Sequence, residues 1–371
     1  MHIKDFLTEQ WMNDYERKAV VNLTDTSSVS LSVNDLLAFE PSFLDGLMLD
    51  YGWITGDPVL RREILSLYAD KREETLTMTG GALQGNQMVM DLLLEYGDHV
   101  ITITPGYQQF SDYPRAKGCS VSEVPLEESD WSLDLEKIKA AIRPETKLVI
   151  FANPSNPTGT WLDPDCMEKL VQICKAHDIW LLCDEVYRSY EDDEISVADQ
   201  YDKGIASASL SKPFGLAGLR LGWLKGNPEI IHRVNVLRDY TIISGGPLGE
   251  GAAAVALKHR HEILERTKEV VDSNCAIIQA WLEKSECFHC VLPKKGTVSF
   301  MQIPECLSSK QFCEDLLEET GIFFVPGACF DKEGYVRLGL GKKHEDLRGA
   351  LERLETYTRR YLEEGRGRRQ G

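Results

Sequence analysis

A lysine, a serine and an arginine occur together in one short segment of the chain. Ser209-Leu-Ser-Lys212 stands at the end of an apolar run over residues 204–210, and Arg220 follows soon after. The Lys212 amine can act as a nucleophile toward an aldehyde. The Ser209 hydroxyl and the Arg220 guanidinium are hydrogen-bond donors that suit a phosphate. The segment therefore predicts a lysine imine with a phosphate group bound beside it.

The same residues allow a second interpretation, in which Ser209 is the nucleophile. A Ser-x-x-Lys pair is also found in penicillin-recognising enzymes, where Ser-Asp-Asn and Lys-Thr-Gly elements accompany it. Here Ser111-Asp-Tyr113 precedes the pair, and the third element is Lys295-Gly-Thr297. The order and the residue types therefore differ, and Ser209 follows a strand where that mechanism needs a helix start. We favour the lysine chemistry.

Three further apolar runs of strand length each lead into a polar or aromatic side chain, namely Tyr107, Asn156 and Asp184. Amphipathic helices are predicted between these runs. This alternation is typical of an α/β fold with a mostly parallel sheet. Ligands of such sheets bind in the crevice at the carboxyl ends of the strands. We therefore expect Tyr107, Asn156, Asp184 and Lys212 to lie along one edge of the sheet.

A glycine pair, Gly80-Gly81, precedes a helix predicted to begin near Ala82. Glycines at a helix start let backbone N–H groups approach an anion, which also meets the positive end of the helix dipole. A tight turn would need the same residues, so the pair alone decides nothing. Other elements predicted from caps and periodicity include a helix from Pro58 to about Lys71, a strand over 219–224 and a strand over 322–325.

The length of 371 residues is sufficient for one large domain and a smaller one. We place the large domain at residues 45–275 and the small domain at residues 1–44 together with 276–371. From about Cys287 the pattern changes from alternating strands and helices to α+β. A long amphipathic helix over residues 262–283 is predicted to connect the two parts.

Charge and hydropathy exclude several classes of protein. Hydrophobic residues make up 43% and charged residues 27% of the chain, as in an ordinary globular enzyme. The net charge of −18 argues against nucleic acid as a partner, because phosphate backbones favour an excess of lysine and arginine. No apolar run resembles a signal peptide or reaches the roughly 18 residues of a membrane span. We therefore expect a cytoplasmic protein without nucleic-acid or membrane partners.

Ten cysteines are scattered along the chain, and Cys287-Phe-His-Cys290 is the one pair with the spacing of metal ligands. No second pair accompanies it, so no metal site is predicted. Free thiols in a reducing compartment explain the cysteines better.

Taken in order, the motifs closely resemble those of fold-type I, pyridoxal-phosphate-dependent class I/II aminotransferases, over about residues 45–340. The resemblance implies the corresponding α/β transferase fold, with a mostly parallel central sheet in a large cofactor-binding domain and a smaller α+β domain built from both termini. The motifs are Tyr51…Gly56-x-Pro58, Gly80-Gly-Ala82, Tyr107, Asn153-Pro-Ser-Asn-Pro-Thr-Gly159, Asp184-x-x-Tyr187, Ser209-x-x-Lys212, Arg220 and Arg337.

The resemblance also implies roles for single residues. Lys212 would form the internal aldimine with pyridoxal 5′-phosphate and then move the proton between the substrate and the cofactor. Asp184 would pair with the pyridinium nitrogen and keep the ring an electron sink. Asn156 and Tyr187 would hydrogen-bond the 3′-oxygen of the ring, and Tyr107 would stack on its face.

Further implied contacts concern the phosphate, the substrate and the subunit. Arg337 would clamp the α-carboxylate of an amino acid or a 2-oxo acid, with Asn156 beside it. Tyr51 would reach the phosphate of the neighbouring subunit, so a homodimer with shared active sites is implied. The implied phosphate ligands within one subunit are Ser209, Arg220 and the amides of Gly81 and Ala82.

The N-terminal stretch departs from the family pattern. It contains Asp25-Thr-Ser-Ser-Val-Ser30 in place of a glycine-rich substrate loop, and no second carboxylate-binding arginine can be assigned. The identity of the substrate side chain therefore stays open. A C–S β-lyase and a cyclase of the capreomycidine-synthase type remain alternatives to an aminotransferase. A regulator with an aminotransferase-like sensor domain is less compatible, since it needs a DNA-binding domain before Tyr51.

Overall fold

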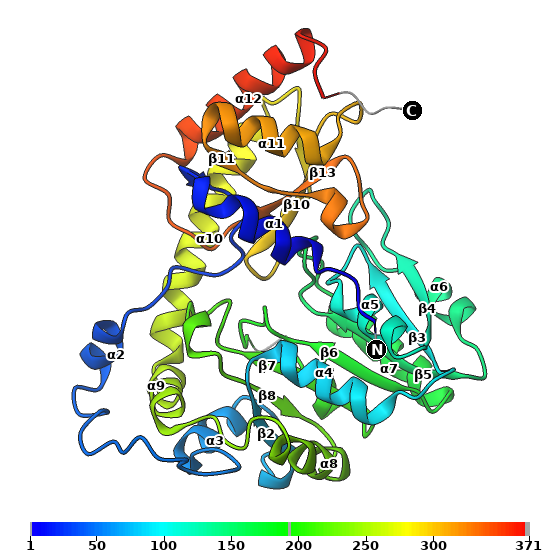
Figure 1. Ribbon diagram of the computed structural model, residues 1–371, viewed down its shortest axis with the longest axis vertical. Helices are drawn as coiled ribbons and strands as arrows, with labels where there is room; N and C mark the ends of the chain where they lie inside the picture. The colour runs from blue at the N-terminus through cyan, green and yellow to red at the C-terminus, as the bar shows by residue number, and fades with distance from the viewer. Residues whose placement is uncertain (1, 192–193, 368–371) are drawn as a thin grey trace.

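A seven-stranded sheet forms the centre of the larger part of the molecule (Figure 1). The computed structural model describes residues 2–191 and 194–367. Within them, β8 runs antiparallel to both of its neighbours and the other strand pairs of this sheet are parallel. This arrangement confirms the predicted mostly parallel α/β sheet. In spatial order the strands are β2 (Leu76–Thr79), β8 (Gly222–Lys225), β7 (Gly204–Ser209), β6 (Trp180–Asp184), β5 (Thr146–Ala152), β3 (His99–Thr104) and β4 (Ser120–Pro125).

Helices cover both faces of this sheet, because successive side chains of a strand point to opposite faces. In β8, Trp223 packs among residues of α3 and α9, whereas Leu224 packs among residues of α4 and α8. The helices of the large part are α3 (Pro58–Leu65), α4 (Ala82–Leu93), α5 (Gln109–Ala116), α6 (Leu135–Ala141), α7 (Pro164–Ala176), α8 (Pro228–Asp239) and α9 (Pro247–Lys258).

The smaller part is built from both ends of the chain, as the fold class predicts. Its four-stranded sheet is antiparallel, in the order β12-β13-β10-β9. The N-terminal strand β1 pairs in parallel with β11, with Val21 opposite Ile322. Its elements are α1 (Leu7–Tyr15), β1 (Val21–Asn22), β9 (His289–Cys290), β10 (Val298–Gln302), α11 (Ser309–Thr320), β11 (Ile322–Phe323), β12 (Val325–Pro326), β13 (Tyr335–Gly339) and α12 (Leu347–Glu363).

A helix of 23 residues, α10 (Arg260–Leu282), runs between the two parts (Figure 1). The chain returns to the large part from β1 through residues 23–32, which pass close to the ends of both sheets, and then forms α2 (Val33–Phe39). Ser32 caps α2 with a capping box, because its hydroxyl accepts from the Asp35 N–H while the Asp35 carboxylate accepts from the Ser32 N–H. No described helix combines the length and apolar character that a membrane crossing requires.

Three predicted boundaries are wrong. Helix α3 ends at Leu65 rather than near Lys71, and Tyr68 leaves the helix to accept a hydrogen bond from the Trp223 indole at 2.8 Å. The strand predicted over 219–224 begins only at Gly222, because the chain first makes a short 3₁₀ turn. The strand predicted over 322–325 is divided between two sheets as β11 and β12.

Candidate active site

The carboxyl ends of β6 and β7 bring the two central predicted residues together. Asp184 is the last residue of β6, and Lys212 follows β7 in the turn that leads toward β8. The Lys212 amine lies 5.7 Å from the centre of the Tyr187 ring. Its positive charge also acts on the Asp184 carboxyl group. The crevice expected from the ends of the strands therefore contains an amine and a carboxyl group close to one another.

Asp184 is buried, with 5% of its surface exposed. Burial raises the pKa of its carboxyl group from 3.8 to about 6, because the charged form loses its hydration. Two hydrogen bonds oppose this shift, one from the Asn86 amide at 2.7 Å and one from the Val186 N–H at 3.0 Å. A buried carboxylate whose charge is only partly compensated is suited to a cationic ring nitrogen.

Asn86 is a site residue that the sequence analysis missed. It is fully buried on α4, donates to Asp184 and accepts from the Ser207 hydroxyl at 2.5 Å. A signal was present in the sequence, because Asn86 has the same helical spacing as buried apolar residues. An asparagine on the apolar face of a helix needs a partner inside the protein. The buried apolar residues at that spacing are Val89, Met90 and Leu93.

Two buried polar atoms of the predicted site residues have no partner among the described residues, the Tyr187 hydroxyl and the Asn156 side-chain oxygen. Tyr187 is 2% exposed and Asn156 is 7% exposed, so neither group is well hydrated. Buried polar groups almost always have hydrogen-bond partners. The Tyr187 hydroxyl is therefore suited to donate to an acceptor of a bound molecule, such as a ring oxygen, and the Asn156 oxygen is suited to accept from a donor of it.

Tyr107 lies on the same side of the sheet, after the end of β3. Burial raises the pKa of its phenol, and the nearby Tyr187 and Asp184 add to this effect. Its ring is 5.0 Å from the ring of Phe6 and 5.8 Å from that of Phe110. An aromatic side chain held in this way can form one wall of a planar binding site.

The predicted phosphate ligands also lie close together. Ser209 is opposite Gly222 in the β7–β8 ladder. A side chain at Gly222 would meet the backbone of Gly81 at 2.6 Å, so the start of α4 is packed directly against this strand. Gly81 has a φ of +87°, which favours glycine, and the Arg220 guanidinium lies 3.1 Å from where its β-carbon would be. Helix N–H groups, a hydroxyl and a guanidinium therefore converge, as an anion site requires.

Arg337 enters the crevice from the small part of the molecule. It is 7% exposed on β13, and its Nε donates to the Thr24 hydroxyl at 3.3 Å. Its guanidinium lies 5.8 Å from the centre of the Phe330 ring. No carboxylate of the described residues lies within 4.0 Å of it. A buried guanidinium without a carboxylate partner is suited to a carboxylate ligand.

Thr26 is a second site residue that the sequence did not indicate. Its hydroxyl accepts a hydrogen bond of 2.7 Å from the Lys212 amine. The two residues are 186 positions apart in the chain. No local pattern joins them, since the contact depends on the path of the N-terminal segment between the two parts.

Tyr51 is the one predicted ligand that lies away from this crevice. It is 67% exposed, in a loop before α3 that also exposes Met48 and Trp53. Gly52 packs against Pro247 at the start of α9. Within a single chain, Tyr51 is therefore presented to the outside of the molecule.

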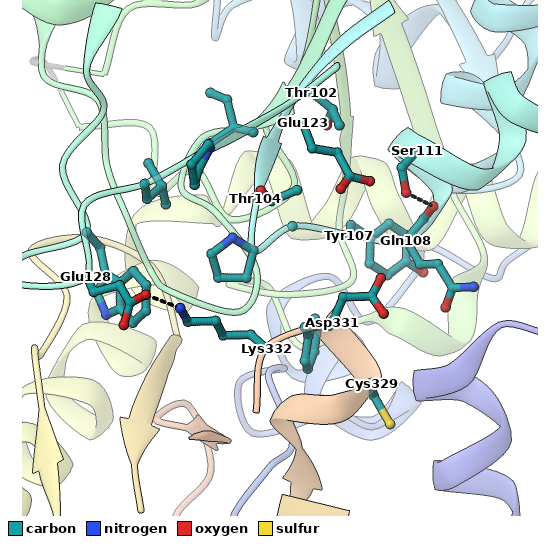
Figure 2. Close-up of a pocket in the computed structure, with 17 residues that line it drawn as sticks. Thr102, Thr104, Tyr107, Gln108, Ser111, Glu123, Glu128, Cys329, Asp331 and Lys332 are labelled. Carbon is teal, nitrogen blue, oxygen red and sulfur yellow. Dashed lines mark hydrogen bonds and ion pairs between the residues drawn. The ribbon is translucent and has the colours of Figure 1, made fainter. Parts of the chain in front are cut away.

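A cavity of about 250 Å³ adjoins the crevice beside Tyr107. Figure 2 shows the side chains of Gln108, Glu123 and Asp331 gathered on one side of it. On another side, Lys332 forms an ion pair with Glu128. The cavity is therefore lined by polar groups that can form hydrogen bonds.

The described residues contain no group of three His, Cys, Asp or Glu side chains that could hold a metal ion.

Comparison with known families agrees with this geometry. The family described as "Aminotransferase class I and II" matches residues 30–354. The chain belongs to this family. It is a pyridoxal-phosphate-dependent transaminase, an enzyme that moves an amino group between an amino acid and a 2-oxo acid.

Three individual relatives are similar to this aminotransferase over most of its length. It is 37% identical to a solved PLP-dependent aminotransferase from Streptococcus suis, covering 97% of this chain and 99% of that one, with a TM-score of 0.93. It is 30% identical to Transaminase BacF of Bacillus subtilis, over 82% of this chain and 80% of the relative. It is 27% identical to capreomycidine synthase of Streptomyces vinaceus, over 98% of this chain and 95% of the relative.

Proposed function

We propose that Lys212 is the lysine that binds pyridoxal phosphate in this aminotransferase. The observation that supports this most strongly is the position of its amine, beside Tyr187 and within the electrostatic field of Asp184 at the carboxyl edge of the sheet. When bound, the cofactor supplies an aldehyde for the amines and a ring that accepts electrons. The residues of the chain bind it, orient it and transfer the proton.

The other proposed contacts follow if the cofactor lies with its aldehyde at Lys212. Asp184 would hold the ring nitrogen, and the unpartnered Tyr187 hydroxyl and the NH₂ group of Asn156 would donate to the 3′-oxygen. Tyr107 would form the wall over the ring. Arg337 and Asn156 would bind the substrate carboxylate, and the substrate side chain would enter the polar cavity beside Tyr107. The proposed phosphate ligands are Ser209, Arg220 and the amides of Gly81 and Ala82.

The reaction type is tested by separating the two half-reactions. The holoenzyme is mixed with one amino acid at a time, and the loss of the visible absorption of the lysine-bound cofactor is followed. A 2-oxo acid is then added. A transaminase regains the band only after this addition, whereas a β-lyase or a cyclase, the alternative that the capreomycidine synthase relative supports, regains it without any oxo acid.

We expect Arg337→Lys to raise KM for every amino acid and every 2-oxo acid about thirty-fold. A guanidinium binds a carboxylate through two parallel hydrogen bonds and an ammonium does not, a difference of about 2 kcal/mol. Steady-state kinetics with several substrates would measure it. Arg353→Lys is the matched control, since Arg353 is half exposed on α12 and pairs with Asp346. A loss restricted to one substrate would show that Arg337 binds a side chain instead.

We also propose a homodimer in which Tyr51 serves the neighbouring subunit. The loop that contains Tyr51 and the start of α9 expose an unusual number of apolar side chains, which an interface would cover. These side chains are Met48, Leu49, Tyr51, Trp53, Ile54 and Leu248. A tyrosine presented outward can reach a phosphate site only across such an interface.

Mixing two inactive variants tests the shared site. Tyr51→Ala and Lys212→Ala homodimers should each be inactive, but a mixed dimer has one site with both lesions and one intact site. Free exchange at equal amounts should therefore restore activity toward about a quarter of wild type. Tyr51→Phe alone should weaken cofactor binding by about 1–2 kcal/mol, a value within the range of a single hydrogen bond.

The matched control mixes Asp184→Asn with Lys212→Ala. These two lesions lie in the same chain's crevice, so their mixed dimers contain no intact site and should stay inactive. If sedimentation shows mixed dimers of the Tyr51 pair without any activity, Tyr51 does not serve the partner.

We retain two further proposals from the sequence. The division into residues 45–275 and residues 1–44 with 276–371 is supported by the separate sheets, except that α2 packs on the large part and α10 crosses the boundary. A cytoplasmic location is supported by the cysteines, all ten of which are free thiols, as expected in a reducing compartment.

A further inference from the structure

The segment of residues 23–31 lies between the two parts of the molecule and contacts both. On the side of the small sheet, the Gly339 N–H donates to the Leu23 oxygen at 2.8 Å. On the side of the lysine turn, the Ser28 N–H donates to the Lys212 oxygen at 3.0 Å, and the Leu31 N–H donates to the Gly215 oxygen at 3.2 Å. The segment is therefore fixed to the backbone that presents Lys212.

Two threonines of this segment contact the two cationic groups of the site. The Thr24 hydroxyl accepts from Nε of Arg337 at 3.3 Å, and the Thr26 hydroxyl accepts from Nζ of Lys212 at 2.7 Å. Both threonines are buried, with 0% and 3% of their surface exposed. In an extended chain, residues two positions apart lie on the same face. One short segment therefore holds the proposed carboxylate-binding group and the proposed reactive amine in a fixed relation.

The Thr26 contact has further support. The backbone carbonyl oxygen of Thr26 accepts a hydrogen bond from the Thr297 hydroxyl. The backbone that presents the Thr26 hydroxyl is therefore itself anchored to the small part. The Ser28 hydroxyl donates to the Pro213 oxygen at 2.9 Å, one residue beyond Lys212. Gly215, at φ +66°, packs against the Val29 oxygen, where a β-carbon would lie at 2.4 Å. Thr26 and Lys212 therefore cannot easily move apart.

We propose that Thr26 is a positioning residue that holds the Lys212 amine whenever the amine is not bonded to the cofactor. The inference rests on the proposed function, in which Lys212 is released by the substrate and must then transfer a proton. A released lysine has four rotatable side-chain bonds, and without an acceptor it samples many orientations. The Thr26 hydroxyl keeps one N–H occupied and the amine within the crevice. Thr24 has the corresponding role for Arg337.

The test measures the exposure of the amine in the cofactor-free protein. The apoprotein is treated with limiting acetic anhydride, and acetylation of Lys212 is quantified by mass spectrometry. Thr26→Val, which keeps the shape and removes the hydroxyl, should be acetylated at Lys212 about five-fold faster than wild type, the equivalent of one ordinary hydrogen bond. Thr26→Ser should retain the wild-type rate. Equal rates in Thr26→Val and wild type would overturn the proposal.

Controls separate this inference from the proposed function. Thr8→Val is the matched variant, because Thr8 is also buried at 3% and its hydroxyl has no partner among the described residues. Its Lys212 acetylation should equal that of wild type, and an increase would mean that any N-terminal threonine loss loosens the fold. Pyridoxal phosphate should protect Lys212 in every variant. Failure of that protection contradicts the role of Lys212 itself, whichever result Thr26 gives.

Turnover provides a second readout in the holoenzyme. Thr26→Val should lower kcat about five-fold with little change in KM, because the amine acts after the substrate is bound. Thr24→Val should raise KM and leave the acetylation of Lys212 unchanged. Rescue of kcat by Thr26→Ser is required, and a Thr26→Ser enzyme as slow as Thr26→Val would contradict the positioning role.

Discussion

Lys212→Ala should bind pyridoxal phosphate, lack the visible absorption of the lysine-bound cofactor, and lose at least about 10⁴-fold in turnover. The phosphate contacts are made by other residues, so binding persists in the variant. What disappears is both the covalent attachment and the group that moves the proton, and proton transfer alone typically contributes 10²–10⁴-fold. Absorption spectra and single-turnover kinetics with one amino acid would measure both effects.

Two further variants sharpen this prediction. Lys212→Arg keeps a positive charge near Asp184 but has no nucleophilic amine, so it should be as slow as Lys212→Ala. Lys203→Ala removes a surface lysine that pairs with Asp178, and should be fully active. Full activity in Lys212→Ala would remove the central proposal.

Asp184→Asn should bind the cofactor and slow the removal of the substrate proton by about 10²–10³-fold or more. An ion pair to the ring nitrogen in a buried site is preorganised electrostatic stabilisation, which contributes about 3–4 kcal/mol. The amide cannot supply this charge. In addition, its NH₂ group must face either the Asn86 amide or the Val186 N–H, both of which donate to the carboxylate. Stopped-flow measurement of the amino-acid half-reaction would test this, with the exposed Asp202→Asn as control.

The raised pKa of Asp184 gives this prediction a dependence on pH. In the cofactor-free chain the carboxyl group is protonated below about pH 6, whereas in the unfolded chain it ionises near 3.8. The ionised group therefore lowers the free energy of unfolding above pH 6, by about 3 kcal/mol relative to pH values below 3.8. A cationic ring nitrogen offsets this cost. Cofactor affinity should therefore fall as pH drops below 6.

That fall in affinity should be absent from Asp184→Asn, which has no proton to gain at this position. Equilibrium titration of the apoprotein with pyridoxal phosphate between pH 5 and 8 would show the difference.

For the rate prediction, a rate of proton removal only about tenfold lower than wild type in Asp184→Asn would mean that another group protonates the ring.

The edge of the sheet could be predicted because each of its residues ends a strand or lies within four positions after one. Tyr107, Asn156, Asp184 and Lys212 need only the rule that parallel strands end at the same edge. Their convergence therefore follows from local sequence and from topology. Asn86 could have been included on similar grounds, since a polar residue on the apolar face of a helix requires a buried partner.

The contacts of the N-terminal segment could not be predicted in this way. Thr24 and Thr26 precede Arg337 and Lys212 by 313 and 186 residues, and no pattern within the segment indicates which cation each threonine meets. Those contacts depend on how the two parts pack. The early end of α3 has the same origin, because the buried Tyr68–Trp223 contact overrides the helical pattern beyond Leu65.

The pairing of β1 with β11 bears on how the protein is made by the ribosome. β1 is synthesised long before its partner β11, and the Val325 N–H donates to the Thr24 hydroxyl across 301 residues. At about 5–20 residues per second, translation between these points takes roughly 15–60 s. During that interval the segment of residues 23–31, which contacts Lys212, cannot yet pair with the small sheet. We therefore expect the nascent large domain to form before residues 23–31 make their contacts with the small sheet, and the site to be completed only after β11 has been synthesised.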